Sequence, residues 1–213
     1  MITVHTLTYN PYQENTYLLA NNNNECIIID PGMHNHQEEA HFENYISNHN
    51  LTPVLLLNTH CHVDHVLGNN FVYEKWGLIP QFHEDEIPVF VSVQNYAPQM
   101  GFKYQPSPIS ETFLNDEEPI QLNDFNIDII LAPGHSPGHL CYYIKDQNIL
   151  IGGDVLFYNS IGRTDLPGGN HQTLLDSIKN KIYTLPDSTT VYPGHGPSTN
   201  IGFEKKTNPF IRA

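Results

Sequence analysis

A dense group of histidines with one aspartate lies in the segment N-T-H-C-H-V-D-H, residues 58–65. Its ligand-type side chains are those of His60, His62, Asp64 and His65. Neutral imidazole and carboxylate are donors that zinc, iron and manganese bind in proteins. Because successive side chains of an extended segment alternate in direction, we expect His60 and His62 to point to one side. The side chains of Asp64 and His65 can reach a second point nearby, so this segment could supply ligands to two metals. The alternative is a histidine-rich surface loop, because the chain contains 13 histidines.

Three further candidate ligands each follow an apolar run with the character of a strand. They are His135 in P-G-H-S-P-G-H, Asp154 in G-G-D and His195 in Y-P-G-H-G. Glycine lies beside each candidate, as expected where the backbone must approach a site closely. Each of these strand ends alone is compatible with an ordinary turn. Together with residues 58–65 they predict a metal site built from distant parts of the chain.

The elements that must position these residues follow from the apolar pattern. We expect strands at residues 2–8, 16–20, 26–29, 53–57, 119–122, 125–131, 139–144, 148–152 and 189–192, helices at 36–49, 66–76, 84–91 and 170–183, and at most one short helix after residue 200. The clearest helix is 170–183, where Asn170 can cap the start and apolar residues repeat at helical spacing. The proline-rich residues 79–115 are expected to form loops over the mouth of the site. Strands in two groups, each followed by helices, predict an α/β layered sandwich.

Charge and composition limit the classes of partner. The chain has 213 residues, 39% of them hydrophobic, which suits one sizeable domain with a real core. Its formal charge is −14, from 9 basic and 23 acidic residues. Nucleic-acid binding needs a face rich in lysine and arginine, so we expect no nucleic-acid partner. We expect a small-molecule substrate instead. The oligomeric state is left open.

The cysteines and the N-terminal residues indicate the compartment. Cys26, Cys61 and Cys141 are odd in number and show no C-x-x-C spacing, so neither a disulfide framework nor a cysteine-based zinc site is expected. Cys61 should point away from the neighbouring ligands, with a ligand role as the alternative. The start of the chain has no basic region followed by an apolar one, and no apolar run reaches membrane-spanning length. We therefore expect a reduced, cytoplasmic protein without a membrane partner.

The motifs taken together resemble a known family. H-C-H-V-D-H at 60–65, P-G-H-S-P-G-H at 133–139, G-G-D at 152–154 and Y-P-G-H-G at 192–196 are similar to the ligand motifs of the metallo-β-lactamase superfamily. Within it, G-D-V-L-F-Y-N-S-I-G-R-T-D at 153–165 looks like the short bacterial branch of glyoxalase II (hydroxyacylglutathione hydrolase) enzymes. The resemblance implies an αββα sandwich of two mixed β-sheets flanked by helices. It covers residues 1–213 as a single domain, without the C-terminal helical domain of long glyoxalase II enzymes.

The resemblance also implies how the ligands are shared. His60, His62 and His135 would hold the first metal, Asp64, His65 and His195 the second, and Asp154 would bridge the two. The cofactors implied are two divalent metal ions per chain, with Zn²⁺ favoured over Fe or Mn. True β-lactamases of this fold generally have cysteine where this chain has Asp154, which argues against β-lactam hydrolysis. His139 matches no ligand and is expected to support the site. Thr59 and Ser136 are expected to fix the histidine tautomers.

The implied activity is hydrolysis of a thioester of the S-lactoylglutathione type by a metal-bridging hydroxide. Asp64 would be catalytic, because it can also accept a hydrogen bond from that hydroxide. Arg163 would bind a substrate carboxylate and Tyr158 would line the pocket. For Arg163 the alternative is an ordinary surface arginine. A single-iron persulfide dioxygenase, which has a similar G-R-T-D segment, is a second possibility for the chain, and a lactonase or another metallo-hydrolase of this fold is a third. Retention of His65 and His195 favours the dinuclear hydrolase.

Overall fold

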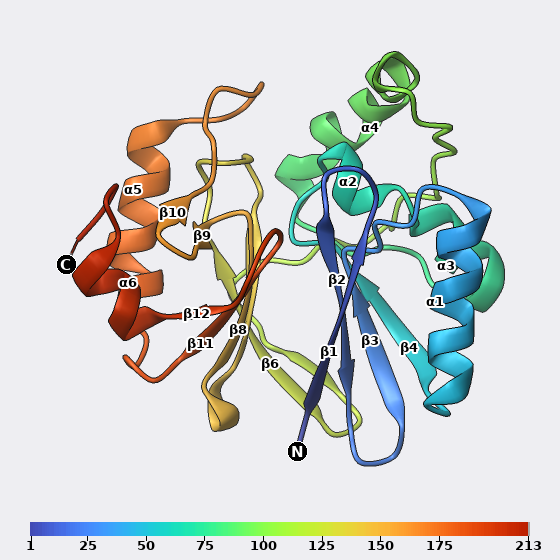
Figure 1. The fold of residues 1–213 in the computed structure, drawn as a ribbon, viewed down its shortest axis with the longest axis horizontal. Coiled ribbons are helices and arrows are strands. Elements are labelled where there is room, and N and C mark those ends of the chain that lie inside the picture. The colour runs from blue at the N-terminus through green and yellow to red at the C-terminus, as the bar shows by residue number, and fades with distance from the viewer. Residues whose placement is uncertain (213) are drawn as a thin grey trace. The chain divides into compact units, whose positions relative to one another are not determined.

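A computed structural model of the protein describes residues 1–212. The chain divides into two compact units. The first unit contains residues 1–82 and 87–114, and the second contains residues 83–86 and the chain from Asn115 onwards. Each unit is built on its own β-sheet, with helices packed against it (Figure 1).

The sheet of the first unit has the order β1-β2-β3-β4. Its strands are β1 (Thr3–Tyr9), β2 (Glu14–Ala20), β3 (Glu25–Ile29) and β4 (Thr52–Leu57). The first three are antiparallel neighbours, whereas β3 and β4 are parallel. A parallel pair needs a crossover connection, and helix α1 (His36–Asn48) provides it. The expected strands and this helix are confirmed, with ends that differ by one or two residues.

Helices of the first unit bury an apolar stripe against this sheet. Phe42 and Ile46 of α1 join one core cluster with Ile28 and Leu56 of the strands. The helix begins at Asn35, whose side chain accepts hydrogen bonds from two backbone N–H groups of the first turn. This half-buried helix has the mixed polar and apolar sequence that such packing requires.

Two of the helices expected between residues 66 and 91 differ from expectation. The single helix expected at 66–76 is two, α2 (Val63–Val66) and α3 (Asn69–Trp76). They are separated because the N–H of Gly68 donates to the Pro31 carbonyl at 2.7 Å instead of continuing a helix. The helix expected at 84–91 is a short 3₁₀ turn η1 (Glu84–Glu86) followed by α4 (Ile87–Tyr96) and the 3₁₀ turn η2 (Ala97–Met100).

The sheet of the second unit is mixed and has the order β12-β11-β8-β7-β6-β5. Its strands are β5 (Ile120–Leu122), β6 (Phe125–Leu131), β7 (Leu140–Ile144), β8 (Ile149–Gly153), β11 (Thr190–Pro193) and β12 (Thr199–Asn200). All neighbours are antiparallel except β8 and β11, which are parallel. A separate hairpin of β9 (Leu156–Phe157) and β10 (Ser160–Ile161) follows β8. The hairpin and β12 are too short to leave a sequence pattern and were not expected.

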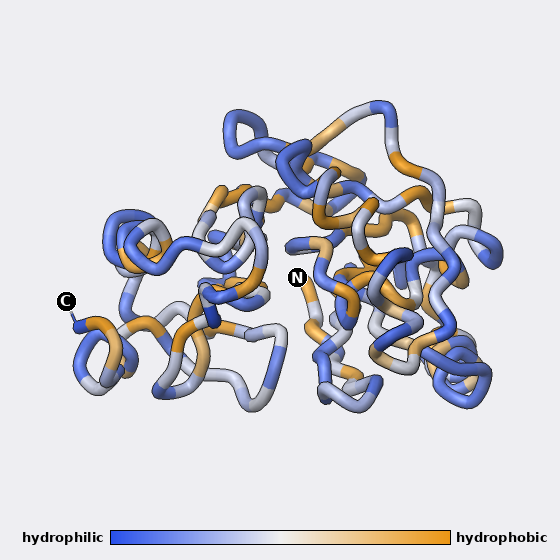
Figure 2. The backbone as a smooth tube through the Cα atoms, turned by 90° about the horizontal axis from the view of Figure 1, so that it is seen from above, coloured by the Kyte–Doolittle hydropathy of each residue, from blue (hydrophilic) through white to orange (hydrophobic). Residues whose placement is uncertain are grey.

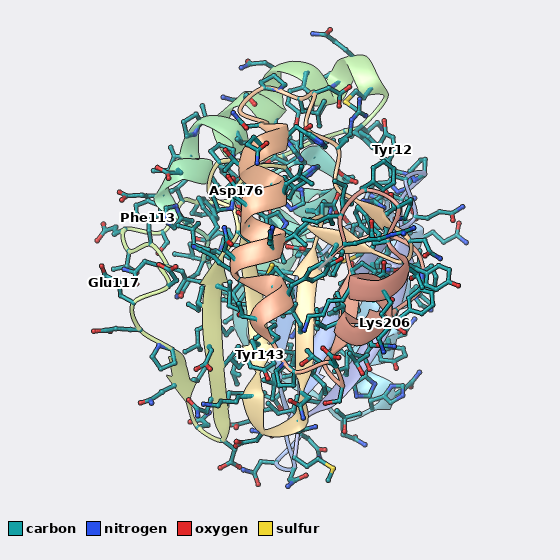
Figure 3. The ribbon with its side chains drawn as sticks, turned by 90° about the vertical axis from the view of Figure 1, so that its left-hand side faces the viewer. Tyr12, Phe113, Glu117, Tyr143, Asp176 and Lys206 are labelled. Carbon is teal, nitrogen blue, oxygen red and sulfur yellow. The ribbon has the colours of Figure 1, made fainter. Side chains whose placement is uncertain are left out.

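Helices α5 (His171–Asn180) and α6 (Ile201–Thr207) complete the second unit. Leu174 and Ile178 of α5 and Ile201 of α6 lie in one core cluster with strand residues of the sheet. Figure 3, in which Asp176 on α5 and Lys206 on α6 are labelled, shows both helices in front of the strands. The coil of α5 carries hydrophilic and hydrophobic colours in turn, as an amphipathic helix should (Figure 2). The 3₁₀ turns η3 (Lys145–Gln147) and η4 (Ile182–Thr184) connect elements of this unit.

Among residues 1–212, no helix combines the length and apolar character needed to cross a bilayer.

Candidate metal centre

The first unit places a ligand-rich loop at the end of β4. Because β3 and β4 are parallel, their carboxyl ends lie at the same edge of the sheet. Asp30 follows β3, and its N–H donates to the carbonyl of Leu57 at 3.0 Å. The histidines at 60, 62 and 65 are all buried, so this segment is packed into the unit and is not a histidine-rich surface loop.

Asp30 fixes the protonation pattern of two of these histidines. Its carboxylate accepts hydrogen bonds from the Thr59 N–H at 2.7 Å, the Thr59 hydroxyl at 2.6 Å and His65 Nδ1 at 3.0 Å. The Thr59 hydroxyl lies 3.0 Å from His60 Nδ1. Since its one proton goes to Asp30, its oxygen must accept from His60 Nδ1. Both imidazoles therefore carry the proton on Nδ1, which leaves each Nε2 lone pair for a metal.

The ligand atoms of Asp30, His60 and His65 lie within 4.8 Å of one another. Asp30 is nevertheless better explained as a support than as a ligand, because both its oxygens accept hydrogen bonds from Thr59 or His65. Asp64 is the better placed carboxylate. Its Oδ2 lies 3.8 Å from His65 Nε2, so that one cation could bind both atoms.

Polar residues of β2 and of the turn before it lie beside this loop and help to hold it in place. Asn10 Nδ2 donates to the carbonyls of Gly32 at 3.0 Å and Asp64 at 3.1 Å. Glu14 is fully buried, and its Oε2 accepts from the Thr16 hydroxyl at 3.0 Å. Burial raises the pKa of Glu14 well above its usual value, against the opposing effects of His65 and of the Thr16 hydrogen bond. Glu14 in the metal-free chain therefore keeps its proton to a higher pH than an exposed glutamate does.

The second unit gathers the remaining candidates at one edge of its sheet. β6 and β8 are each antiparallel to β7, and β8 is parallel to β11, so β6, β8 and β11 all run in the same direction. Their carboxyl ends therefore lie at one edge, and His135, Asp154 and His195 follow those three ends.

The three side chains meet at the Asp154 carboxylate. Asp154 Oδ2 lies 3.5 Å from His135 Nε2 and 3.6 Å from His195 Nε2. His135 Nδ1 lies 2.8 Å from the carbonyl oxygen of Arg163, which can only accept, so Nδ1 carries the proton and Nε2 has the lone pair. One carboxylate oxygen between two imidazole nitrogens is the arrangement expected of a carboxylate that touches two cations. The donors of both units fit divalent metals of the zinc, iron or manganese type.

Two further residues hold Asp154 in place. His139 is buried and its Nε2 accepts the N–H of Asp154 at 2.9 Å, which agrees with the supporting role expected for it. Gly162 packs directly on the same residue. A Cβ at position 162 would lie 1.9 Å from the Asp154 carbonyl oxygen and 3.2 Å from His135 Cβ, so only glycine fits there.

The expected substrate residues lie on the surface of the second unit. Arg163 makes two hydrogen bonds to Asp165, from Nε at 2.7 Å and from Nη2 at 2.8 Å. These bonds lower the pKa of Asp165 to about 2. The Tyr158 side chain is exposed, and its ring stacks on Phe203 of α6 with the ring centroids 5.2 Å apart.

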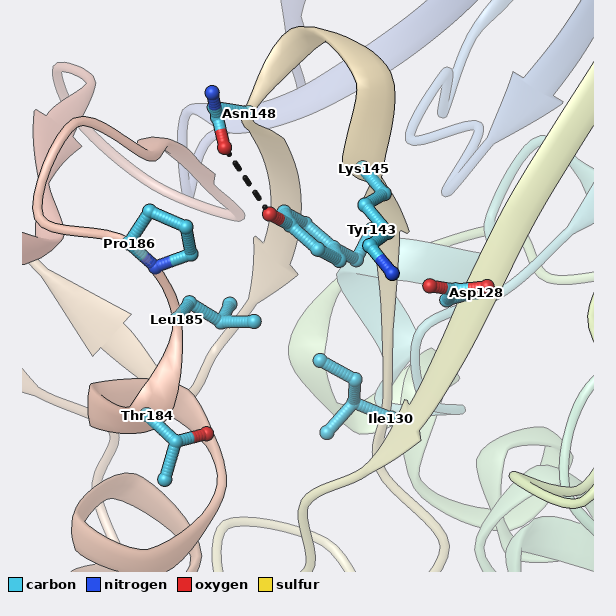
Figure 4. Close-up of a pocket in the computed structure, with 8 residues that line it drawn as sticks. All are labelled: Asp128, Ile130, Tyr143, Lys145, Asn148, Thr184, Leu185 and Pro186. Atoms are coloured by element: carbon cyan, nitrogen blue, oxygen red, sulfur yellow. Dashed lines mark hydrogen bonds between the residues drawn. The ribbon is translucent and has the colours of Figure 1, made fainter.

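A hollow of about 500 Å³ lies elsewhere on the second unit (Figure 4). It is lined by Asp128, Ile130, Tyr143, Lys145, Asn148, Thr184, Leu185 and Pro186. The Tyr143 hydroxyl donates to Asn148 Oδ1 at 3.2 Å across it. None of the expected ligands lines this hollow.

A model of the metallo-beta-lactamase superfamily matches residues 9–195. The chain belongs to this superfamily. Among curated relatives, "Probable metallo-hydrolase YqgX" of Bacillus subtilis (strain 168) is 39% identical over 203 residues, covering 94% of this chain and 93% of the relative. "Hydroxyacylglutathione hydrolase GloC" of Haemophilus influenzae (strain ATCC 51907 / DSM 11121 / KW20 / Rd) is 35% identical over 208 residues, covering 95% and 94%. The expected family is therefore confirmed.

Two solved structures are also similar to this chain over nearly its whole length. The BLEG-1 B3 metallo-beta-lactamase superposes with a TM-score of 0.91 at 34% identity, covering 99% of this chain and 100% of that one. TTHA1623, solved in a di-iron-bound form, superposes with a TM-score of 0.87 at 33% identity, covering 97% and 100%. These likenesses confirm the expected metallo-β-lactamase fold, with mixed sheets flanked by helices. Together with the donor sets above, they support divalent metals as cofactors.

Some supporting residues differ from those expected. The contact from Thr59 to a histidine is present, but Ser136 donates to Glu86 instead of to an imidazole. The sequence interpretation missed Asp30, although an aspartate followed by Pro-Gly at the end of a buried strand is the same signal that singled out Asp154. It also missed Glu86 and the Arg163 carbonyl, for which the sequence has no signal. Cys61 lies in an apolar cluster with Val63 and Phe82, as expected of a residue that points away from the ligands.

Proposed function

We propose that the chain is a binuclear metallo-hydrolase that cleaves thioesters of the hydroxyacylglutathione type. The observation that carries the proposal is the Asp154 carboxylate oxygen, which lies 3.5 Å and 3.6 Å from the nitrogens of His135 and His195. A carboxylate so placed is suited to bridging two metals. The 35% identity to GloC supports the thioester class.

We propose that the donors of the two units act together. His60, His62 and His135 would hold one ion, Asp64, His65 and His195 would hold the other, and Asp154 would serve both. The residues form a single metallo-β-lactamase-like domain in this proposal, and Zn²⁺ is the metal favoured. The three cysteines are buried and form no disulfide with one another, in keeping with a reducing cytoplasmic compartment.

Each residue then has a defined task in hydrolysis. When bound, the metals would lower the pKa of a water to about 7 and polarise the thioester carbonyl. Asp64 accepts a hydrogen bond from the attacking oxygen and orients it. The new bond joins that oxygen to the carbonyl carbon, and the carbon–sulfur bond breaks. The thiolate leaves with the electron pair and needs no strong acid, and the carboxylic acid formed releases a proton.

Recognition of the substrate is proposed for Arg163 and Tyr158. Arg163 would bind a carboxylate of the glutathione-type carrier, for which it must exchange its bond to Asp165. R163Q is expected to raise KM with little change in kcat. D165N serves as the matched variant, because it frees the guanidinium and should lower KM. Equal KM values in all three proteins would contradict the assignment.

The central experiment measures metal content and substrate class together. Wild-type protein is expected to contain two divalent ions per chain and to hydrolyse S-D-lactoylglutathione and related thioesters. Glutathione persulfide with oxygen uptake is the parallel assay, since one iron per chain with oxygen consumption would identify a dioxygenase and refute the hydrolase. A panel of lactones tests the remaining alternative in the same way.

A second candidate activity comes from the likeness to BLEG-1, since that protein is a B3 metallo-beta-lactamase and is 34% identical. We rank β-lactam hydrolysis below thioester hydrolysis because of Asp154. A chromogenic cephalosporin assayed beside the thioester decides the order. A larger kcat/KM for the cephalosporin would reverse it.

A further inference from the structure

We propose that Glu86 is a positioning residue of the metal centre, which holds the loop bearing His135 and His139 and acts through His139 on Asp154. This inference rests on the proposed function. Glu86 lies about fifty residues before that loop in the sequence, in the 3₁₀ turn η1. The short segment His83–Glu86 belongs to the second unit, although the residues on both sides of it belong to the first.

Glu86 is fully buried and makes specific contacts. Its Oε1 accepts hydrogen bonds from the Ser136 hydroxyl at 2.5 Å and from the Gly138 N–H at 2.8 Å. Ser136 follows His135 directly, and Gly138 precedes His139 directly. A buried carboxylate is costly unless it is hydrogen-bonded, so these two donors help to stabilise Glu86 in the interior.

Gly138 shows how closely the two segments approach. A Cβ at this position would lie 3.0 Å from His83 Cβ and 3.1 Å from Glu86 Cγ. The absence of a side chain at 138 therefore lets the 83–86 turn lie directly on the loop. The second glycine of P-G-H-S-P-G-H thus has a packing reason that is separate from metal binding.

The contacts continue from the loop to the backbone of Asp154. His139 Nε2 accepts the N–H of Asp154 at 2.9 Å, and its carbonyl accepts the N–H of Ala132 at 2.8 Å. Holding Gly138 therefore fixes the backbone from which His139 reaches Asp154. The side-chain carboxylate of Asp154 lies 3.5 Å from His135 Nε2, and Ser136, which follows His135, is the other donor to Glu86. Both ends of the His135–Asp154 pair thus depend on one buried acceptor.

The test compares E86A and E86Q with E84A. Glu84 is an exposed residue of the same turn, so E84A changes the charge of the turn without touching the loop. Glutamine retains an oxygen that can accept both hydrogen bonds, so E86Q should rescue what E86A loses. Loss of a group that orients a ligand typically weakens metal binding by about 10–100-fold.

Metal affinity is measured by competition with a chelator, and amide exchange of the metal-free protein is measured by NMR. E86A is expected to weaken binding of the ion held by His135 by about 10–100-fold, while E86Q and E84A stay within about threefold of wild type. In E86A the Gly138 and Asp154 amides should exchange at least about tenfold faster. These readouts are compared with the thermal stability of each metal-free variant.

Two results of the metal-binding measurements would overturn the inference. One is an E86A protein that loses stability but binds metal as tightly as wild type, since Glu86 would then only support the fold. The other is an E86Q protein as weak as E86A. The double variant E86A/S136A adds a check, because the two losses should be far from additive if both act on one hydrogen bond. If wild-type protein binds no metal, the proposed function fails, and unchanged exchange at Gly138 and Asp154 in E86A would separately refute the positioning role.

Discussion

Substitution of Asp30 by asparagine gives the most specific prediction for the metal centre. D30N keeps the size of the side chain but replaces one acceptor oxygen by an NH₂ donor. In one orientation the NH₂ faces the Thr59 hydroxyl and His65 Nδ1, and in the other it faces the Thr59 N–H. Either orientation sets a donor against a donor, and both remove the negative charge that favours the proton on His65 Nδ1.

The expected magnitude follows from these contacts. A buried hydrogen bond to a charged group contributes about 1.5–3 kcal/mol. Each 1.4 kcal/mol corresponds to about tenfold in a binding constant, so the loss is roughly 10–150-fold. His65 depends on Asp30 directly, and His60 depends on it through the Thr59 hydroxyl. Since the two histidines are assigned to different metals, D30N should weaken both.

T59V is the matched comparison, because valine has the shape of threonine but no hydroxyl. It removes the partner of His60 Nδ1 and leaves the bond from His65 to Asp30 intact. Chelator competition should then give a weaker first metal and an unchanged second one, whereas D30N weakens both. The assay is a two-step competition isotherm, with histidine tautomers of the metal-free proteins read by ¹H–¹⁵N NMR. Unchanged binding in D30N, or equal losses of both metals in T59V, would refute the tautomer argument.

Three further predictions follow from the same geometry. D154A should reduce the metal content from two ions per chain to one or none and abolish hydrolysis, since Asp154 faces both His135 and His195; full activity in this variant would sink the bridging assignment. G162A should lower the unfolding free energy by about 1–3 kcal/mol, the usual cost of overpacking, because its Cβ would meet the Asp154 carbonyl. Thermal unfolding measures this loss, and S160A, a nearby change that adds no atoms, is the control. E14Q should become more stable than wild type as the pH of the metal-free protein rises above 4.5, by up to about 1.4 kcal/mol per pH unit. The reason is that folded wild-type protein retains a proton on Glu14 that the unfolded chain releases. Parallel pH dependences of unfolding in the two proteins would contradict the raised pKa of Glu14.

The ligand types and their order along the chain were determined by the sequence alone. Residues 60–65 contain imidazole and carboxylate side chains, and a single candidate ligand follows each of three later apolar runs. This pattern predicted metal binding. Strand positions were also predictable, because a buried strand such as β3 is a continuous apolar run bounded by turn residues. The family match over residues 9–195 agrees with both interpretations.

The residues that orient the ligands were decided by the tertiary structure. Asp30 is next to the loop that bears His65 only because β3 and β4 pair in parallel, so that their carboxyl ends coincide. No local pattern in the sequence marks such a pairing. The Arg163 carbonyl that fixes His135 is a backbone atom, and its identity leaves no trace in the residue type.

Glu86 is another residue whose role could not be predicted from the sequence. It lies in a run of acidic residues, H-E-D-E, that has the composition of a solvated turn, and its neighbours Glu84 and Asp85 are indeed exposed. Only the packing of residues 83–86 in the second unit buries Glu86 and gives it two donors from the His135 loop. The sequence therefore determined which side chains can bind metal at residues 58–65 and at the strand ends. The tertiary structure decided which nitrogen of His60, His65 and His135 carries the proton, because that choice depends on hydrogen bonds with other parts of the chain.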